Sequence, residues 1–429
     1  MERNQLKEMI KNGAYDARLK ALYAADAAAL EAQKARYIKA IEEFEALYPE
    51  LDDVVIFSAP GRTEVGGNHT DHQYGRVLAA AVNLDIIAVA AKTEGTVVKV
   101  KSEGFKGDVV DISVLEPQEE EATHSPSLVR GVARGFSDAG YQIGGLSAYT
   151  TSSVLKGSGL SSSAAFEVLI GTMFNYLYND GKVDAVKIAQ ISQFAENVFF
   201  GKPCGLMDQT ASSVGGFITI DFADPKAPVV EKVPYDFSKS GYRLCIVNTG
   251  GNHADLTPDY AAVPAEMKAA ARVFGKEVLR QVDPAEFMAN IAKVREAVND
   301  RAALRAIHFF AENDRVVDEV NALNAGDFDA FKGLVIESGN SSYRYLQNVY
   351  SSINPAEQGI SLALAISEGI LKGKGAWRVH GGGFAGTIQA FVPECLVDTY
   401  VAAIEAVFGE GSCYLLSIRA EGGIRSLPC

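Results

Sequence analysis

The sequence lacks the features that would tie the protein to a membrane or, in general, to nucleic acid. Its 429 residues include no long run of Lys and Arg, and its formal net charge is −14, which disfavours binding to polyanionic surfaces. The most apolar run, residues 77–91, is interrupted by Asn83 and Asp85, so it is too short and too polar to span a bilayer. Any anionic ligand must therefore be held by a small, local site.

Cysteine pairs and the most familiar nucleotide-binding motif are also missing. The five cysteines are odd in number and never form CxxC, which argues against a disulfide framework or a zinc ribbon. The first residues do not combine a basic start with an apolar run, so we expect no targeting signal and a cytoplasmic protein with reduced thiols. No GxxxxGKS or GxxxxGKT segment occurs, which excludes a Walker-type phosphate site.

The hydrophobic pattern predicts an α+β protein of two domains, residues 1–225 and 226–429. In the first domain it predicts one or two helices within 1–48, a strand at 54–57 that Ala59-Pro60-Gly61 ends, further strands at 77–91, 96–101, 108–112, 146–151 and 217–221, and helices at 126–139 and 184–200. In the second it predicts strands at 243–248, 376–380, 387–392 and 413–418, regions dominated by helices at 262–281 and 300–372, and a last helix at 396–408.

Residues 156–166, KGSGLSSSAAF, have the composition of a phosphate-binding loop. A predicted strand precedes them and an amphipathic helix follows, so the order is strand, Gly-rich loop, helix. Gly157 and Gly159 would let the backbone approach an anion, the first helical turn offers unpaired N–H groups, and the serine hydroxyls can reach phosphate or metal. The alternative is a Gly/Ser turn that only caps a helix.

Residues 62–76, RTEVGGNHTDHQYGR, concentrate hydrogen-bonding side chains in a Gly-punctuated loop. His69, Asp71 and His72 could bind a metal, but HTDH lacks the one-face helical spacing of HExxH and no third ligand cluster is nearby. Recognition of a polyol is favoured, because neighbouring hydroxyls each need a donor and an acceptor. A loop solvated by its own polar groups is the remaining alternative.

Three further positions could take part in chemistry. Asp208 follows a Pro/Gly-constrained turn, KPCGLMD, and could be a catalytic carboxylate or a helix cap. Glu196 falls off the apolar stripe of the predicted helix 184–200, so it is most simply a solvated carboxylate. Residues 380–386, HGGGFAG, lie between two predicted strands, where three glycines predict the close approach of a ligand or another loop; a wide β-turn is the alternative.

Taken together, these segments resemble the sugar kinases of the GHMP superfamily, and most closely the galactokinase family. Residues 59–71 are similar to the galactokinase signature, KGSGLSSSAA is similar to the superfamily's phosphate loop, and HGGGFAG is similar to its third motif. The resemblance implies a two-domain fold with the active site between the domains. It also implies an ATP- and Mg²⁺-dependent kinase that phosphorylates the anomeric C1 hydroxyl of a monosaccharide, converting galactose to galactose 1-phosphate.

The resemblance also assigns roles residue by residue. It implies that Asp208 orients or deprotonates the anomeric hydroxyl, with Arg62 stabilising that carboxylate, and that Ser163 and Glu196 hold Mg²⁺. The positions that it places at the sugar are Asn68, His69, Asp71, Gly205 and Tyr260. The positions that it places around the ATP phosphates are Gly157, Ser158, Gly159, Leu160, Ser161, Ser162 and Ser163.

The chain also departs from the family pattern. Glu64 stands where the family usually has Asn, and Asn68 stands where it usually has a sugar-contacting Glu, so two residue types are exchanged within one loop. The exchange leaves open a kinase for another sugar or small alcohol, and a sugar- and ATP-binding sensor without turnover; the intact SSSA at 161–164 and Asp208 argue against the sensor. We expect a monomer or weak homo-oligomer whose partners are a sugar and ATP, not nucleic acid or membrane.

Overall fold

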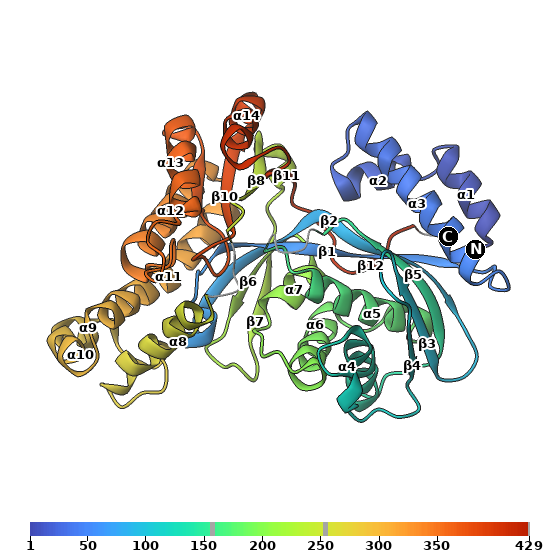
Figure 1. Ribbon diagram of the computed structural model, residues 1–429, viewed down its shortest axis with the longest axis horizontal. Helices are drawn as coiled ribbons and strands as arrows, with labels where there is room; N and C mark the ends of the chain where they lie inside the picture. The colour runs from blue at the N-terminus through green and yellow to red at the C-terminus, as the bar shows by residue number, and fades with distance from the viewer. Residues whose placement is uncertain (155–158, 252–255, 428–429) are drawn as a thin grey trace.

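The computed structural model describes residues 1–154, 159–251 and 256–427, which form two β-sheets flanked by helices (Figure 1). The larger sheet has eight strands in the order β12-β1-β2-β5-β3-β4, with β6 paired to β2 and β7 paired to β6. Its strands are β1 (Val55–Gly66), β2 (Arg76–Lys92), β3 (Val97–Ser102), β4 (Asp108–Asp111), β5 (Leu146–Ser152), β6 (Phe217–Asp221), β7 (Val229–Val233) and β12 (Ile424–Arg425).

The central strand β2 shows why both faces of this sheet are covered. Its side chains alternate, so that Ala88 and Ala90 belong to one buried cluster while Ile87, Val89 and Ala91 belong to another. A strand that is apolar on both faces needs a layer of helices on each side. The helices on one face are α4 (Ser125–Asp138), α5 (Ser162–Tyr178), α6 (Ala185–Phe194) and α7 (Met207–Val214).

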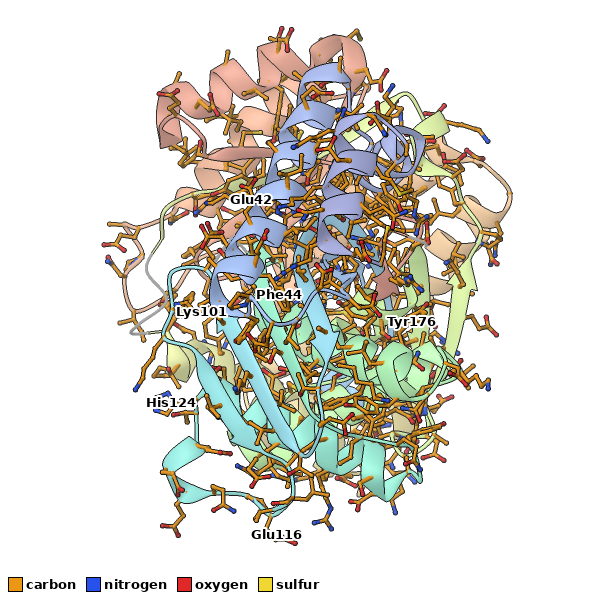
Figure 2. The ribbon with its side chains drawn as sticks, turned by 90° about the vertical axis from the view of Figure 1, so that its right-hand side faces the viewer. Glu42, Phe44, Lys101, Glu116, His124 and Tyr176 are labelled. Atoms are coloured by element: carbon orange, nitrogen blue, oxygen red, sulfur yellow. The ribbon has the colours of Figure 1, made fainter. Side chains whose placement is uncertain are left out.

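The other face of the sheet is covered by three N-terminal helices, α1 (Arg3–Lys11), α2 (Asp16–Tyr23) and α3 (Ala27–Leu47). Figure 2 shows them lying across the strands, with the fully buried Phe44 on α3. The two chain ends lie near each other beside these helices (Figure 1), where Arg18 Nε donates to the carbonyl of Ser426 at 3.1 Å. This layer buries the second apolar face of β2.

The smaller sheet has the order β11-β8-β10-β9 and is entirely antiparallel. Its strands are β8 (Tyr242–Asn248), β9 (Ala376–Val379), β10 (Thr387–Pro393) and β11 (Cys413–Leu416). The helices in this part of the chain are α8 (Thr257–Arg272), α9 (Pro284–Ala289), α10 (Ile291–Ala297), α11 (Asp300–Asn324), α12 (Phe328–Ser341), α13 (Gly359–Leu371) and α14 (Val397–Phe408). Long α11 reaches from these helices to the larger sheet, where it contacts β1 and β2.

The predicted α+β class and the strand, loop, helix order at β5 and α5 are confirmed. Two local predictions are wrong. The N-terminal region has three helices instead of one or two, and β1 continues through Ala59-Pro60-Gly61 to Gly66. The register of β1 against β2 shifts between Pro60 and Arg62, and an irregularity of this kind accommodates a residue without an N–H. Residues 62–66 of the predicted loop 62–76 are therefore strand, and β2 begins at its last residue, Arg76.

Two strands after residue 225, β7 and β12, pair within the larger sheet, and the division of the chain at that residue stays a prediction. The part of the chain that is described contains no helix with the length and apolar character needed to cross a membrane.

Candidate active site

The candidate site is built around an ion pair between Arg62 on β1 and Asp208 in the first turn of α7. The contact is bidentate: Arg62 Nε lies 2.7 Å from Asp208 Oδ1, and Arg62 Nη2 lies 2.9 Å from Oδ2. The third guanidinium nitrogen donates to the carbonyl of Gly159, and the hydroxyl of Ser161 donates to Asp208 Oδ2. A bidentate contact of this kind holds the carboxylate in one orientation and stabilises its negative charge.

Asp208 combines a stabilised charge with access to solvent. Burial opposes its ionisation, but the charge of Arg62 and the hydrogen bonds from Arg62 and Ser161 outweigh that effect and lower its pKa. Its side chain nevertheless keeps 32% of its surface exposed. Asp208 is therefore an ionised carboxylate that a ligand can reach. The alternative of a helix-capping residue finds no support, because the N-cap of α7 is Leu206 and the hydrogen bonds described for the Asp208 side chain come from Arg62 and Ser161.

The predicted phosphate loop runs directly into α5 beside this ion pair. Gly159 has φ 72° and Ser161 has φ 56°, a left-handed conformation that lets the chain turn sharply before Ser162 begins the helix. The backbone N–H of Arg62 donates to the carbonyl of Leu160 at 3.0 Å. The loop and Asp208 thus face one region, where a helix N-terminus would stabilise an anion. The predicted residues Gly157 and Ser158 lie outside the described part of the chain.

Glu196 lies next to this helix start. Ser163 Oγ is 3.4 Å from Glu196 Oε1, and the exposed Lys202 places its Nζ 3.0 Å from the same oxygen. The simplest interpretation of Glu196, a solvated carboxylate, is wrong, because this residue is only 2% exposed. Glu196 follows the buried Ser192 by four residues and so lies on the inward face of this helix, and a π-helical turn at Ala195–Phe200 ends it.

A second carboxylate and an amide in this cluster were not predicted. Gln209 Nε2 donates to Glu196 Oε2 at 2.8 Å and to Glu167 Oε2 at 3.1 Å. Burial, followed by the nearby charge of Glu196, raises the pKa of Glu167 well above its usual value. Glu167 follows Ser163 by four residues on one helix, so the sequence held a signal for it: the two side chains share a face. Gln209 links this pair to the neighbouring Asp208.

His69 and Tyr260, two of the predicted sugar contacts, both approach the glycine-rich segment between β9 and β10. His69 Nε2 lies 3.0 Å from the carbonyl of Gly382, and the Tyr260 hydroxyl donates to the carbonyl of Gly383 at 2.8 Å. Both side chains remain partly exposed. The structure therefore brings the first and third motifs together with α8.

Two glycines of this third segment, Gly382 and Gly383, are required by close contacts. A Cβ on Gly383 would lie 2.0 Å from the carbonyl oxygen of Asn348, and one on Gly382 would lie 2.7 Å from the ring of Tyr260. The expected approach of another loop is confirmed, and the wide β-turn alone does not explain the glycines.

Asp71 and Gly205 lie against each other. A Cβ on Gly205 would lie 2.9 Å from Asp71 Oδ2, so glycine lets the 205 backbone approach that carboxylate. Both residues line a cavity of about 740 Å³ together with His72 and Cys204. Among the described residues, no group of three or more His, Cys, Asp or Glu side chains is placed to bind a metal, so the metal reading of HTDH has no third ligand.

Asn68 differs from the other predicted sugar contacts because it is fully buried. Its Nδ2 donates to Glu64 Oε1 at 2.9 Å and to the carbonyl of Gly381 at 2.7 Å. Its Oδ1 accepts hydrogen bonds from Ser342 and Asn348. A sugar could bind the Asn68 amide only by replacing one of these partners, and its role as a contact stays a prediction.

Glu64, the other exchanged residue, pairs with a buried arginine. Arg378 Nη2 on β9 lies 3.0 Å from Glu64 Oε1, and the fully buried Arg378 also donates to the carbonyl of Val65. Burial raises the pKa of Glu64 and the charge of Arg378 opposes that rise. The two exchanged residues thus form one hydrogen-bonded pair, in contact with the smaller sheet.

Comparison with known proteins places this arrangement among the GHMP kinases. The galactokinase galactose-binding signature matches residues 42–92, and the GHMP kinases N terminal domain matches residues 127–216. The crystal structure of Lactococcus lactis galactokinase complexed with galactose superposes with a TM-score of 0.74 at 25% identity, covering 90% of this chain and 98% of that chain. A mevalonate kinase shares the fold, with a TM-score of 0.62 at 12% identity, covering 86% of this chain and 100% of that chain.

Curated relatives define the family more narrowly. The galactokinase of Streptomyces coelicolor is 31% identical over 370 residues, covering 86% of this chain and 92% of the relative. The galactokinase of Glaesserella parasuis is 32% identical over 358 residues, covering 83% of this chain and 89% of the relative. The chain therefore belongs to the galactokinase family and is a sugar kinase, which confirms the resemblance inferred from its motifs.

Proposed function

We propose that this protein transfers the terminal phosphoryl group of ATP to the anomeric C1 hydroxyl of a monosaccharide, with galactose as the substrate. The observation that carries the proposal is the Asp208 carboxylate, partly exposed and held by Arg62 beside the start of α5. One side of this ion pair faces the predicted phosphate loop. Asp71 and the loop at Gly205 would hold the sugar on the other side.

In this proposal Asp208 positions the nucleophile. The sugar C1 oxygen forms a bond to the terminal phosphorus, the bond from that phosphorus to the bridging oxygen of ADP breaks, and the hydroxyl proton passes to Asp208 or to solvent. Because the pKa of Asp208 is lowered, the carboxylate accepts a hydrogen bond from the hydroxyl more readily than it keeps the proton. Phosphoryl transfer mainly needs alignment and charge neutralisation, which suits a positioning carboxylate.

Arg62 and the start of α5 would supply positive charge on either side of the reacting oxygen. The Arg62 guanidinium neutralises Asp208, and its remaining nitrogen holds the carbonyl of Gly159, which fixes the loop. The backbone N–H groups at the helix start would bind the oxygens of the ATP phosphates. Leu160, Ser161 and Ser162 are the described residues that we assign to this contact, with Gly159 at the turn.

Ser163 and Glu196 fit a magnesium ion and are the residues that would hold it. A hydroxyl and a carboxylate 3.4 Å apart are oxygen ligands of the type that Mg²⁺ prefers, and such an ion keeps further positions for water and phosphate. When bound with ATP, the ion would neutralise charge on the phosphates. Lys202, which now pairs with Glu196, is exposed and can move aside.

The test is ADP release with Mg²⁺-ATP across a panel of monosaccharides, with sugar-free protein as the control for plain ATP hydrolysis. We expect turnover with galactose above that background. Sugar binding without ADP would indicate a sensor, and turnover only with another sugar would retain the kinase and reject galactose. Both exchanged residues, Glu64 and Asn68, lie in the segment matched by the galactose-binding signature. If the substrate is not galactose, their position therefore favours another sugar over a small alcohol.

We further propose that the enzyme acts in the cytoplasm as a monomer or weak homo-oligomer. The four cysteines that the structure describes are free, including the buried Cys245 and Cys413, which is compatible with a reducing compartment. Size-exclusion chromatography with light scattering, over a range of protein concentrations, tests the oligomeric state.

A further inference from the structure

The loop that carries His69 and Asp71 is held by helix α11. We call residues 67–71 the signature loop. Two fully buried side chains of α11, His308 and Glu312, contact its backbone, although they follow it in the chain by about 240 residues. Neither residue belongs to the segments matched by the two family models.

Glu312 binds two consecutive backbone amides of the signature loop. Its Oε1 accepts the N–H of Gly67 at 3.1 Å and that of Asn68 at 3.3 Å, together with the hydroxyl of Ser338. Its Oε2 pairs with Arg315. Burial opposes the charge of Glu312, but the charges of Arg378 and Arg315 and the hydrogen bond from Ser338 help to lower its pKa. Every neighbour of the two oxygens is therefore a donor to an ionised carboxylate.

His308 contacts the backbone carbonyl of Asn68, the residue whose N–H binds Glu312. Its Nε2 lies 2.9 Å from the carbonyl oxygen of Asn68, and its Nδ1 lies 2.9 Å from Ser341 Oγ. A carbonyl only accepts, so Nε2 carries the proton and Nδ1 accepts from the serine. Burial lowers the pKa of His308 to about 4, which keeps this tautomer neutral near pH 7. Asn68 is thus held at both ends of its backbone.

The held segment has a conformation that needs support. Gly67 has φ 84° and His69 has φ 58°, and the second value is unfavourable for a side chain that carries a Cβ. The left-handed residue 67 turns two successive N–H groups toward one side, where they make a small anion-binding concavity. Glu312 fills that concavity from within the protein.

We propose that Glu312 and His308 are positioning residues that fix the signature loop so that His69 and Asp71 point toward the sugar. The part of the proposal that concerns the sugar rests on the function proposed above. The part that concerns the support of the signature loop by α11 does not depend on that function. Neither residue would touch the substrate. Because ATP is assigned to α5, the loss of either contact should weaken sugar binding and leave ATP binding nearly unchanged.

The test compares Glu312→Gln with Glu319→Gln. In Glu312→Gln, one amide NH₂ must face either the backbone donors or Arg315, so the contact cannot be kept complete. Glu319 is on the same helix and fully buried, and neither of its oxygens has a hydrogen-bond partner. Its carboxyl lies against Gly66, just before the signature loop, so its amide variant is the control for exchange within residues 67–71. Burial, followed by the nearby charge of Glu312, raises the pKa of Glu319 well above its usual value, so the amide replaces a group whose charge is already disfavoured.

The first measurement is amide hydrogen exchange over residues 64–76, which needs no activity. We expect faster exchange in Glu312→Gln than in the natural protein, and no change within residues 67–71 in Glu319→Gln. The second is steady-state kinetics, where we expect KM for the sugar to rise about tenfold in Glu312→Gln, as for the loss of a charged hydrogen bond, with KM for ATP within twofold.

Two results would overturn the proposal: unchanged exchange in the signature loop, or equal rises in both KM values. If the natural protein turns over no sugar, the proposed function fails, and the exchange measurement still decides whether α11 holds the loop. Should Glu312→Gln fold poorly, His308→Phe and His308→Gln give a second pair. Glutamine can donate to the Asn68 carbonyl, so it should restore slow exchange where phenylalanine does not.

Discussion

Two carboxylates in this protein have similar partners but different exposure. Asp208 is held by Arg62 and Ser161, and Glu312 is held by an arginine and a serine in the same manner. The side chain of Asp208 is 32% exposed, whereas that of Glu312 is fully buried and binds backbone amides as well. An ion pair alone thus does not mark a reacting group. Access decides whether the carboxylate meets a ligand or supports the fold.

The largest expected effect comes from removing the exposed charge. Asp208→Asn should lower turnover by about 10²-fold or more, the range for a group that guides proton transfer. ADP release at saturating sugar and ATP measures the change, and the melting temperature serves as the control for folding. Turnover close to that of the natural protein would show that Asp208 takes no part in the mechanism. Asp208 and Glu312 would then not differ in function as proposed.

The exchanged pair, Glu64 and Asn68, tests whether the buried Glu64 carboxylate tolerates a second acid beside it. Asn68→Glu would place a second acid 2.9 Å from Glu64 in a site without solvent, so we expect a loss of about 3 kcal/mol in unfolding free energy. Denaturant unfolding measures it. The double variant Glu64→Asn/Asn68→Glu restores one acid and one amide, and should recover part of the loss. A double variant no more stable than Asn68→Glu would show that the two positions are not interchangeable.

Glu196 is buried like Glu312 but lies beside the exposed site, so it tests whether burial alone excludes a ligand. Glu196→Gln keeps the shape and removes the charge, and we expect the Mg²⁺ concentration for half-maximal activity to rise about tenfold, a change of about 1.4 kcal/mol. Calorimetric titration of Mg²⁺ with a nonhydrolysable ATP analogue gives a readout apart from activity. An unchanged Mg²⁺ requirement would leave Glu196 as a structural residue.

The smallest effect concerns acid pH. The pKa of Glu312 is about 2 in the folded protein, below about 4.3 for an unfolded chain, so the native state binds fewer protons and loses stability as pH falls through this window. Neutral His308, with a pKa of about 4, acts in the same direction between about pH 6.5 and 4. Melting temperatures of Glu312→Gln and the natural protein should therefore converge from pH 7 to pH 3 by a few degrees.

Local patterns predicted the order of elements well where apolar periodicity was strong. The strand at β2 and the helices α4 and α14 lie within a few residues of their predicted ranges, and the helix α5 follows the Gly-rich segment as predicted. The strand β1 was cut short because Pro60 normally ends a strand, and only the irregular pairing with β2 explains its continuation. The short β12 carries too few residues to show a period.

The site was predictable where a motif holds its residues close together. The segment from Gly159 to Ser163 was assigned to phosphate on a local signal, a helix start that supplies its own N–H groups, and this assignment stays a prediction. Glu196 was misjudged because the apolar residues alone were used to define the inward face, whereas that face also carries polar side chains such as Ser192, four residues earlier. Glu312 and Arg378 gave no signal, since their partners are residues hundreds of positions earlier in the chain.

The sequence by itself determined the three glycine-rich segments, the strand, loop, helix order at the phosphate loop, and the family. These depend on backbone freedom and periodicity, which are local properties. Only the tertiary structure decided that Arg62 meets Asp208, that Asn68 is buried against Glu64, and that α11 supports the signature loop. The physical reason is that a buried polar group requires a partner, and the fold brings that partner from a distant part of the chain.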